Sequence, residues 1–230
     1  PPRSTPSNSS AASDVYKRQY IERRWWQRLK SLVFLGIMLA VVYVAVFLFP
    51  GHVNKLALVK SAVEQGQFWR FFTHPFSHLS LTHLITNLLA FTIAIVLAVE
   101  LKTRFKNFSV NYFLAGFLAI LPLWFLLKFT ILGASAAIYA GFGLVSLDAP
   151  KYKIKAWIVL GVFLALIFTK SAVTYLSLGF GGQFVVDIEQ ALSHFSGLGF
   201  GIMMFFLFAK MDKVSLEKKS CTLRRCHEKS

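Results

Sequence analysis

Long apolar stretches constrain the fold of this chain more than any other feature. A helix needs about 20 predominantly apolar residues to cross the ~30 Å hydrocarbon layer of a bilayer. Of the 230 residues, 56% are hydrophobic and only 15% are charged, which is too apolar for a soluble domain of this size. Stretches of the required kind run over residues 32–49, 79–99, 108–127, 131–147, 156–178 and 188–209. The sequence therefore predicts an all-α membrane protein with six transmembrane helices.

The rest of the chain divides into three segments. Residues 1–19 are rich in Pro, Ser and Ala without an apolar period, so we expect disorder, and their SSAASDVYKRQ stretch resembles adaptor sequence rather than native protein. Residues 20–30 mix two tryptophans with basic residues and suit a helix at the headgroup level. Residues 31–209 form the six-span domain, and residues 210–230 form a basic tail. The first span lacks a following small-residue cleavage site, so it should remain in the mature protein.

The chain has a net charge of +15, and its basic residues are concentrated in alternate loops, on one side of the predicted membrane. Of the 25 Lys and Arg residues, 20 lie before the first span, after the second and fourth spans, and in the tail. By the positive-inside rule, both termini are cytoplasmic, as in a multi-pass protein of a bacterial inner membrane. The charge thus indicates topology and contact with anionic lipid headgroups. No base-reading motif accompanies it, so we do not expect a nucleic-acid partner.

The tail also holds both cysteines. Cys221 and Cys226 lie where thiols stay reduced, which argues against a structural disulfide. With His227 they resemble a metal cluster only weakly, because the spacing is wide and a fourth ligand is missing. We expect a solvated tail, no metal and no cofactor.

Polar groups within the spans are costly in lipid, so each is a functional candidate. In the second span, His83 and Asn87 are four residues apart and share one helix face. Both can donate hydrogen bonds without carrying a charge, which suits the stabilisation of an oxyanion. The alternative is hydrogen bonding that joins neighbouring helices.

Ser135 opens the fourth span, which is short. Asp148 marks the cytoplasmic end of this span. The 14 residues from Asp148 back to Ser135, at ~1.5 Å each, cover only about 20 Å of the ~30 Å layer, so we expect Ser135 to lie below the outer surface. The positive end of the helix dipole favours an anion there, as acyl transfer requires. The alternative role is an N-cap, which a serine at a helix start more often has.

His194 enters the last span from the same predicted side as Ser135. Gly197 and Gly201 follow on its helix face, and the fourth span offers small residues in return: Ala136, Ala140, Gly141 and Gly143. Two such helices can approach closely, which would bring the imidazole to the serine as its base. No Asp or Glu is placed to complete a triad, so we expect a dyad. Tyr139, one turn beyond Ser135, can pack on the imidazole or serve in ordinary helix packing.

Three motifs in order resemble the rhomboid family over nearly the whole six-span core. Residues 69–88, WRFFTHPFSHLSLTHLITNL, resemble its WR loop followed by H-x-x-x-N. Residues 133–136, GASA, resemble G-x-S-G, and residues 194–201, HFSGLGFG, resemble H-x-x-G-x-x-x-G. The aromatic loop over 50–78 would be the family's first outer loop, partly embedded in the membrane.

The resemblance implies a serine endopeptidase that cuts transmembrane protein substrates near their outer ends. Ser135 would attack the carbonyl, His194 would shuttle the proton, and the Ser135 amide, His83 and Asn87 would bind the oxyanion. Gly133 belongs to the serine motif, Trp69 and Arg70 would support the first outer loop, and Glu100 matches a family acidic residue. One departure is Ala136, which replaces the motif's second glycine and adds a methyl beside the nucleophile.

Three other functions are compatible with parts of this pattern. A rhombosortase-like member would process C-terminal sorting tails, but the WRFFTH stretch is closer to ordinary bacterial rhomboids. A catalytically silent rhomboid-like protein would bind membrane clients without cutting them, and the intact Ser135 and His194 argue against it. A small transporter would usually show internal repeats or charges at mid-membrane, which the sequence lacks.

Overall fold

The computed structural model describes residues 8–124 and 130–227. Six helices form the bundle: α1 (Asn8–Leu48), α5 (Leu81–Glu100), α6 (Phe105–Leu118), α7 (Ser135–Ser146), α8 (Ala156–Leu178) and α9 (Gly182–His227). Short helices fill the connections: α2 (His52–Leu56), α3 (Lys60–Glu64), α4 (Arg70–Thr73), and the 3-10 turns η1 (His74–Phe76), η2 (Leu121–Leu123) and η3 (Ala149–Tyr152). In this part of the chain the only β-type pairing is one isolated bridge between Leu58 and Ile131. The predicted all-helical fold class is confirmed.

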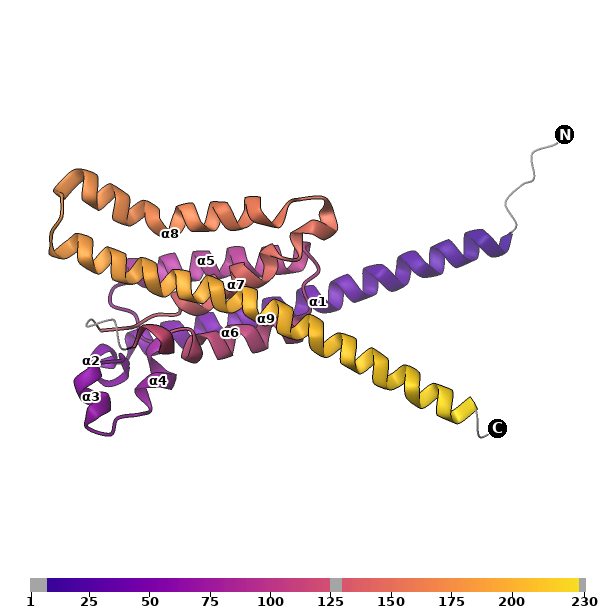
Figure 1. Ribbon diagram of the computed structural model, residues 1–230, viewed down its shortest axis with the longest axis horizontal. Coiled ribbons are helices and arrows are strands. Elements are labelled where there is room, and N and C mark those ends of the chain that lie inside the picture. Colours follow the sequence, from indigo (N-terminus) through magenta and orange to yellow (C-terminus); the bar gives the residue numbers. More distant parts are fainter. Residues whose placement is uncertain (1–7, 125–129, 228–230) are drawn as a thin grey trace.

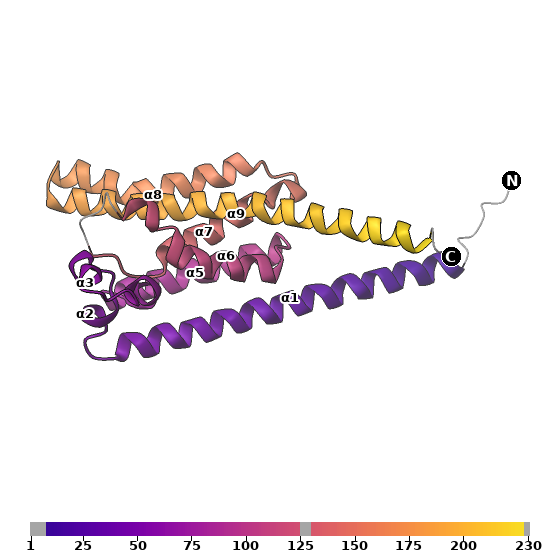
Figure 2. The ribbon, with the colours of Figure 1, turned by 60° about the horizontal axis from the view of Figure 1, so that its bottom comes forward.

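The six bundle helices run roughly side by side, and the connections gather at two ends (Figure 1). One end carries α2 to α4 and the turn between α8 and α9, and we call it the loop end. At the other end α1 and α9 extend beyond the bundle to the two termini, as both views show (Figure 2). We call this the tail end, and it also holds the α5–α6 turn and η3.

Four helices are long and apolar enough to cross a membrane: Trp25–Leu48, Leu81–Glu100, Ala156–Leu178 and Phe184–Ser215. α6 has 14 residues and α7 has 12, so they reach only about 21 Å and about 18 Å. In the span expected over 108–127, α6 ends at Leu118, shortly before Pro122. Proline has no backbone N–H to donate within a helix, so the helix is interrupted there. Residues 125–127 of that span lie outside the described residues. Four of the six expected spans are therefore helices long enough to cross a membrane, and the helices at the other two places, α6 and α7, are shorter than a span.

The two flanking segments are helical where the structure describes them. α1 begins at Asn8, inside the leader that we expected to be disordered, and runs without interruption through residues 20–30. α9 likewise continues through the basic tail as far as His227. The first and last spans are thus parts of longer helices.

α7 lies at the centre of the core. All its residues from Ala136 to Ser146 are buried except Tyr139, which is half-buried. α8 is the opposite case, because in its described part only Phe163, Ile167 and Ser171 are buried. The bundle therefore surrounds α7 with protein and leaves α8 at the periphery, packed on α7 and α9.

Candidate active site

Ser135 is the first residue of α7, at the loop end. Ala134 occupies the N-cap position with no side-chain capping bond, so Ser135 does not have the N-cap role that was its alternative. The first N-H groups of a helix have no partner within the helix, and the Ser135 amide is one of them. The first turn of α7 therefore presents backbone donors and the positive end of its dipole beside the serine side chain.

His83 and Asn87 lie against the segment that leads into Ser135. A Cβ atom placed on Gly133 would lie 2.9 Å from His83 Nε2 and 3.8 Å from Asn87 Nδ2. Gly133 has φ +92°, a left-handed conformation that favours glycine, and its amide donates to the His74 carbonyl at 2.9 Å. The two side chains, which the i, i+4 spacing predicted to share one face of α5, both lie close to Gly133, two residues before the serine.

The helix that carries His83 and Asn87 has a well-defined start. Ser80 is its N-cap, with extended backbone, and its Oγ accepts from the His83 amide at 3.1 Å. Asn87 is buried and donates one Nδ2 hydrogen to the His83 carbonyl at 2.9 Å. Its side chain is therefore held at the face of α5 that meets Gly133.

His194 stacks on Tyr139, with ring centroids 4.6 Å apart and planes inclined by 17°. Tyr139 lies one turn along α7 from Ser135, so the imidazole sits beside the first turns of α7. The sequence offered stacking and ordinary packing as alternatives for Tyr139, and the structure brings it onto the imidazole. Ser135 and His194 lie on adjoining turns of α7 and α9, rather than on opposite sides of the bundle.

Glycines bring α7 and α9 into backbone contact. A Cβ on Gly197 would lie 2.2 Å from the Ala136 carbonyl oxygen, and one on Gly201 would lie 2.0 Å from that of Ala140. Gly143 of α7 meets the Leu198 carbonyl in the same way, at 2.2 Å. The predicted small-residue seam is present, and the buried Ala136 fits within it. Gly141 is the exception, because it faces Phe108 of α6 instead.

Arg70 ties together the connections at the loop end. Its guanidinium donates to the carbonyls of Ala57 at 2.6 Å and Asn54 at 2.7 Å, and Nε donates to Gln67 Oε1 at 2.8 Å. Trp69, beside it, is exposed. The bridge between Leu58 and Ile131 joins this same loop to the segment before Ser135. Arg70 and the bridge thus link the long loop to the start of α7.

Two buried histidines belong to the last part of this loop, just before α5. Burial lowers the pKa of His74 to about 4, although its Nδ1 donates to the Arg70 and Phe71 carbonyls, each at 3.1 Å. Burial, followed by the charge of His83, also lowers the pKa of His78 to about 4. Both imidazoles are therefore neutral at neutral pH. The His78 ring lies edge-on to His83, with centroids 5.2 Å apart.

Of two acidic residues, one lies at the helix end where the sequence placed it, and the other was missed. Glu100 is the last residue of α5, at the tail end, and is exposed; it lies at the opposite end of the bundle from Ser135. Asp187 was missed, because the last span was drawn from residue 188. Asp187 is buried and accepts from Thr174 Oγ1 of α8 at 2.6 Å. Its spacing of seven residues from His194, two helical turns, is the signal that could have identified it.

The family model for the Rhomboid domain matches residues 65–211. The chain belongs to the rhomboid family. No curated protein matches it significantly. The matched segment contains His83, Asn87, Gly133, Ser135 and His194. Rhomboid proteins in general are intramembrane serine proteases, and inactive forms exist. With its four long apolar helices, this rhomboid is an integral membrane protein.

Proposed function

We propose that this rhomboid is an intramembrane serine endopeptidase in which Ser135 is the nucleophile and His194 its general base. The observation that carries the proposal is the stacking of His194 on Tyr139, one turn from Ser135, across a glycine seam. A serine hydroxyl is hardly ionised at neutral pH and needs a base within reach. A hydrogen bond from Ser135 Oγ to the imidazole belongs to the proposal, and such bonds often tighten only when substrate binds.

The reaction would proceed by acyl transfer. Ser135 Oγ attacks the peptide carbonyl carbon while His194 accepts the hydroxyl proton, and the carbonyl oxygen becomes an oxyanion. The Ser135 amide, His83 and Asn87 donate to this oxygen, and the close packing of His83 and Asn87 on Gly133 supports this role. His194 then gives the proton to the leaving amine as the C–N bond breaks. Water then attacks the acyl ester carbon while His194 accepts its proton, the bond to Ser135 Oγ breaks, and His194 returns the proton to Ser135 Oγ as the carboxylic acid product leaves.

The substrates would be transmembrane proteins that present an unwound segment at the loop end. Unwinding a helix in lipid exposes amides that need partners, so substrates with Gly or Pro near the cleavage site should be favoured. Because Ser135 lies at the start of a helix of only 12 residues, the segment has to reach it from that end. Trp69 and Arg70 would support the loop around this site.

A fluorophosphonate probe tests the dyad directly. The wild-type protein should be labelled, Ser135→Ala should abolish labelling, and His194→Ala should reduce it at least about 100-fold. Asn87→Ala should lower the rate about 10-fold to 100-fold with little change in folding. Labelling that persists in Ser135→Ala would overturn the assignment. A folded wild type that takes up no probe would instead favour the silent client-binding function.

The orientation that we propose places both termini in the cytoplasm and the loop end on the outer side. The basic residues of the leader and tail support it through the positive-inside rule. Cys221 and Cys226 serve as reporters, since they are the chain's two cysteines. In intact spheroplasts an impermeant maleimide should label them only after permeabilisation. Labelling without permeabilisation would reverse the orientation.

A further inference from the structure

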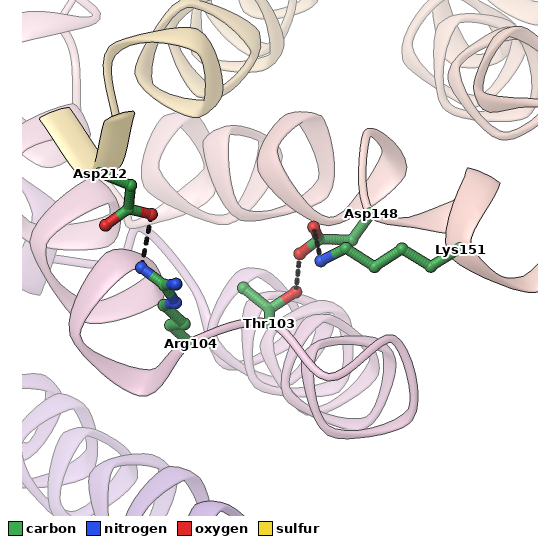
Figure 3. Close-up of polar contacts among 5 residues, drawn as sticks. All are labelled: Thr103, Arg104, Asp148, Lys151 and Asp212. Atoms are coloured by element: carbon green, nitrogen blue, oxygen red, sulfur yellow. Dashed lines mark hydrogen bonds and ion pairs between the residues drawn. The ribbon is translucent and has the colours of Figure 1, made fainter. Parts of the chain in front are cut away.

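A buried carboxylate follows α7 directly at the tail end. Asp148 is 5% exposed, and its two oxygens are both engaged. Oδ2 accepts from Thr103 Oγ1 at 2.6 Å, and Oδ1 accepts from Lys151 Nζ at 2.5 Å (Figure 3). Thr103, in the turn between α5 and α6, is 2% exposed. Because a buried carboxylate is stable only with such partners, the end of α7 is tied to the α5–α6 turn.

α7 depends on ties of this kind because it is short. Its 12 residues reach about 18 Å, so both ends together cannot extend to the two levels where interfacial side chains set the depth of a longer span. At the loop end, the Gly133 amide donates to the His74 carbonyl at 2.9 Å. At the tail end, the corresponding tie is Thr103 to Asp148. Hydrogen bonds at both ends thus join α7 to neighbouring segments, in addition to its seam with α9.

A small axial displacement is enough to matter for the reaction. The glycine seam with α9 resists separation of the helices, but a displacement of about 1 Å at a reacting atom can lower a rate about 100-fold. A helix transmits such a displacement along its length, and Asp148 lies about 20 Å from Ser135 along α7. The ties at the two ends could thus control how Ser135 meets His83, Asn87 and His194.

We propose that Asp148 is a positioning residue for Ser135, held in place by the Thr103 hydroxyl. Asp148 touches neither the substrate nor the dyad and acts through α7. The expected effect of Asp148 on the reaction rate rests on the proposed function. The structural role of Asp148, in which its bond with Thr103 fixes the depth of α7, stands apart from catalysis.

The same end of the bundle supplies a matched control. Arg104, next to Thr103, forms an ion pair with Asp212 of α9 (Figure 3). The side chains of this pair are 63% and 47% exposed, and neither belongs to α7. Asp212→Asn therefore removes a carboxylate contact beside the same turn without touching the end of α7.

The kinetic test removes the hydroxyl while keeping the shape of the side chain. In proteoliposomes with a model transmembrane substrate, Thr103→Val should lower kcat about 10-fold or more, with KM within about twofold. Thr103→Ser, which keeps the hydroxyl, should restore kcat, and Asp212→Asn should leave it unchanged. Thr103→Val with wild-type kcat, failure of Thr103→Ser to restore it, or an equal loss in Asp212→Asn would each overturn the proposal.

A second readout does not need activity. With Cys221 and Cys226 replaced by Ser, the Ser135→Cys protein reports the depth of α7 through its rate of reaction with a water-soluble maleimide. Adding Thr103→Val should change this rate about threefold or more, and adding Asp212→Asn should not. An unchanged rate would overturn the positioning role even if the chain cleaves substrates. A changed rate in a protein that takes up no fluorophosphonate would leave the role standing while the proposed enzyme fails.

Discussion

The two ends of α7 are held by different chemistry. At the loop end, the residues that lead into Ser135 rest on backbone contacts: the Gly133 amide bonds to the His74 carbonyl, and Leu58 pairs with Ile131. At the tail end, the ties are side-chain contacts with one carboxylate, because Asp148 accepts hydrogen bonds from the Thr103 hydroxyl and the Lys151 ammonium. Backbone contacts leave little room for adjustment, whereas side-chain ties can be altered singly. The loop end should therefore respond to added bulk, and to pH as well because it contains the buried histidines His74 and His78. The tail end should respond to the removal of single polar groups.

The largest effect should come from the seam that joins the two ends. A Cβ on Gly201 would lie 2.0 Å from the Ala140 carbonyl oxygen and 2.9 Å from the Leu144 amide, both backbone atoms. Gly201→Ala should force α7 and α9 apart and lower the free energy of unfolding by about 3 kcal/mol. Thermal unfolding in detergent measures it. Gly199→Ala is the control on the same helix, since a Cβ there meets nothing within 4 Å. Equal stability of the two variants would mean that the close approach at the seam does not stabilise the packing of α7 on α9.

Gly133→Ala should break the loop end alone. The new methyl would lie 2.8 Å from His83 Cε1, and alanine rarely adopts φ +92°. We expect the fluorophosphonate labelling rate to fall about 100-fold, because the residues beside Ser135 must shift. Gly66→Ala separates crowding from strain, since Gly66 has φ +87° but open space around it. Comparable losses in both variants would assign the effect to strain in the loop rather than to the contact with His83.

Acid should weaken the loop end through its buried histidines. The pKa of His74, about 4 because of burial, lies below the value of about 6.5 for an unfolded histidine, so the unfolded state binds more protons between these values. The stability contribution is complete above pH 6.5 and is lost as the pH falls toward 4. From pH 7 to pH 5 the loss should be about 2 kcal/mol, and His78 should add a similar amount.

Unfolding measured at pH 7 and pH 5 checks this sign and size. His74→Asn keeps a donor for the Arg70 and Phe71 carbonyls but does not titrate in this range. It should remove roughly half of the pH dependence. A variant as sensitive to acid as the wild type would show that these histidines do not set the response of the loop end.

Much of this organisation was predictable from local patterns. The i, i+4 spacing of His83 and Asn87 placed them on one helix face, and the glycines at 197 and 201 predicted a close approach of two helices. Both features depend only on helical periodicity, which sequence carries directly. The rhomboid motifs added the expected order of these elements, and the match over residues 65–211 confirms the family.

Features that depend on the course of the backbone between helices were not predictable. The contact of Gly133 with His74 and the bridge between Leu58 and Ile131 join segments far apart in sequence, and no periodicity encodes them. The break near Pro122 shortened a span that hydropathy alone extended to residue 127. Asp148 served only as the end point for counting along α7, because burial of a carboxylate by Thr103 follows from tertiary packing.

The smallest effect should come from the exposed pair at the tail end. Arg104 and Asp212 join the α5–α6 turn to α9, but both side chains are largely in solvent, where such pairs contribute about 0.5 kcal/mol. A double-mutant cycle with Arg104→Gln and Asp212→Asn should give a coupling energy of this size that declines between 0.1 M and 1 M salt, because exposed charges are screened. A coupling energy above about 2 kcal/mol that does not decline with salt would mean that the Arg104–Asp212 pair is as strong as a buried ion pair. The tail end would then be fixed through α9 as well as through Asp148, and the contrast between its single buried tie and the backbone contacts of the loop end would be wrong.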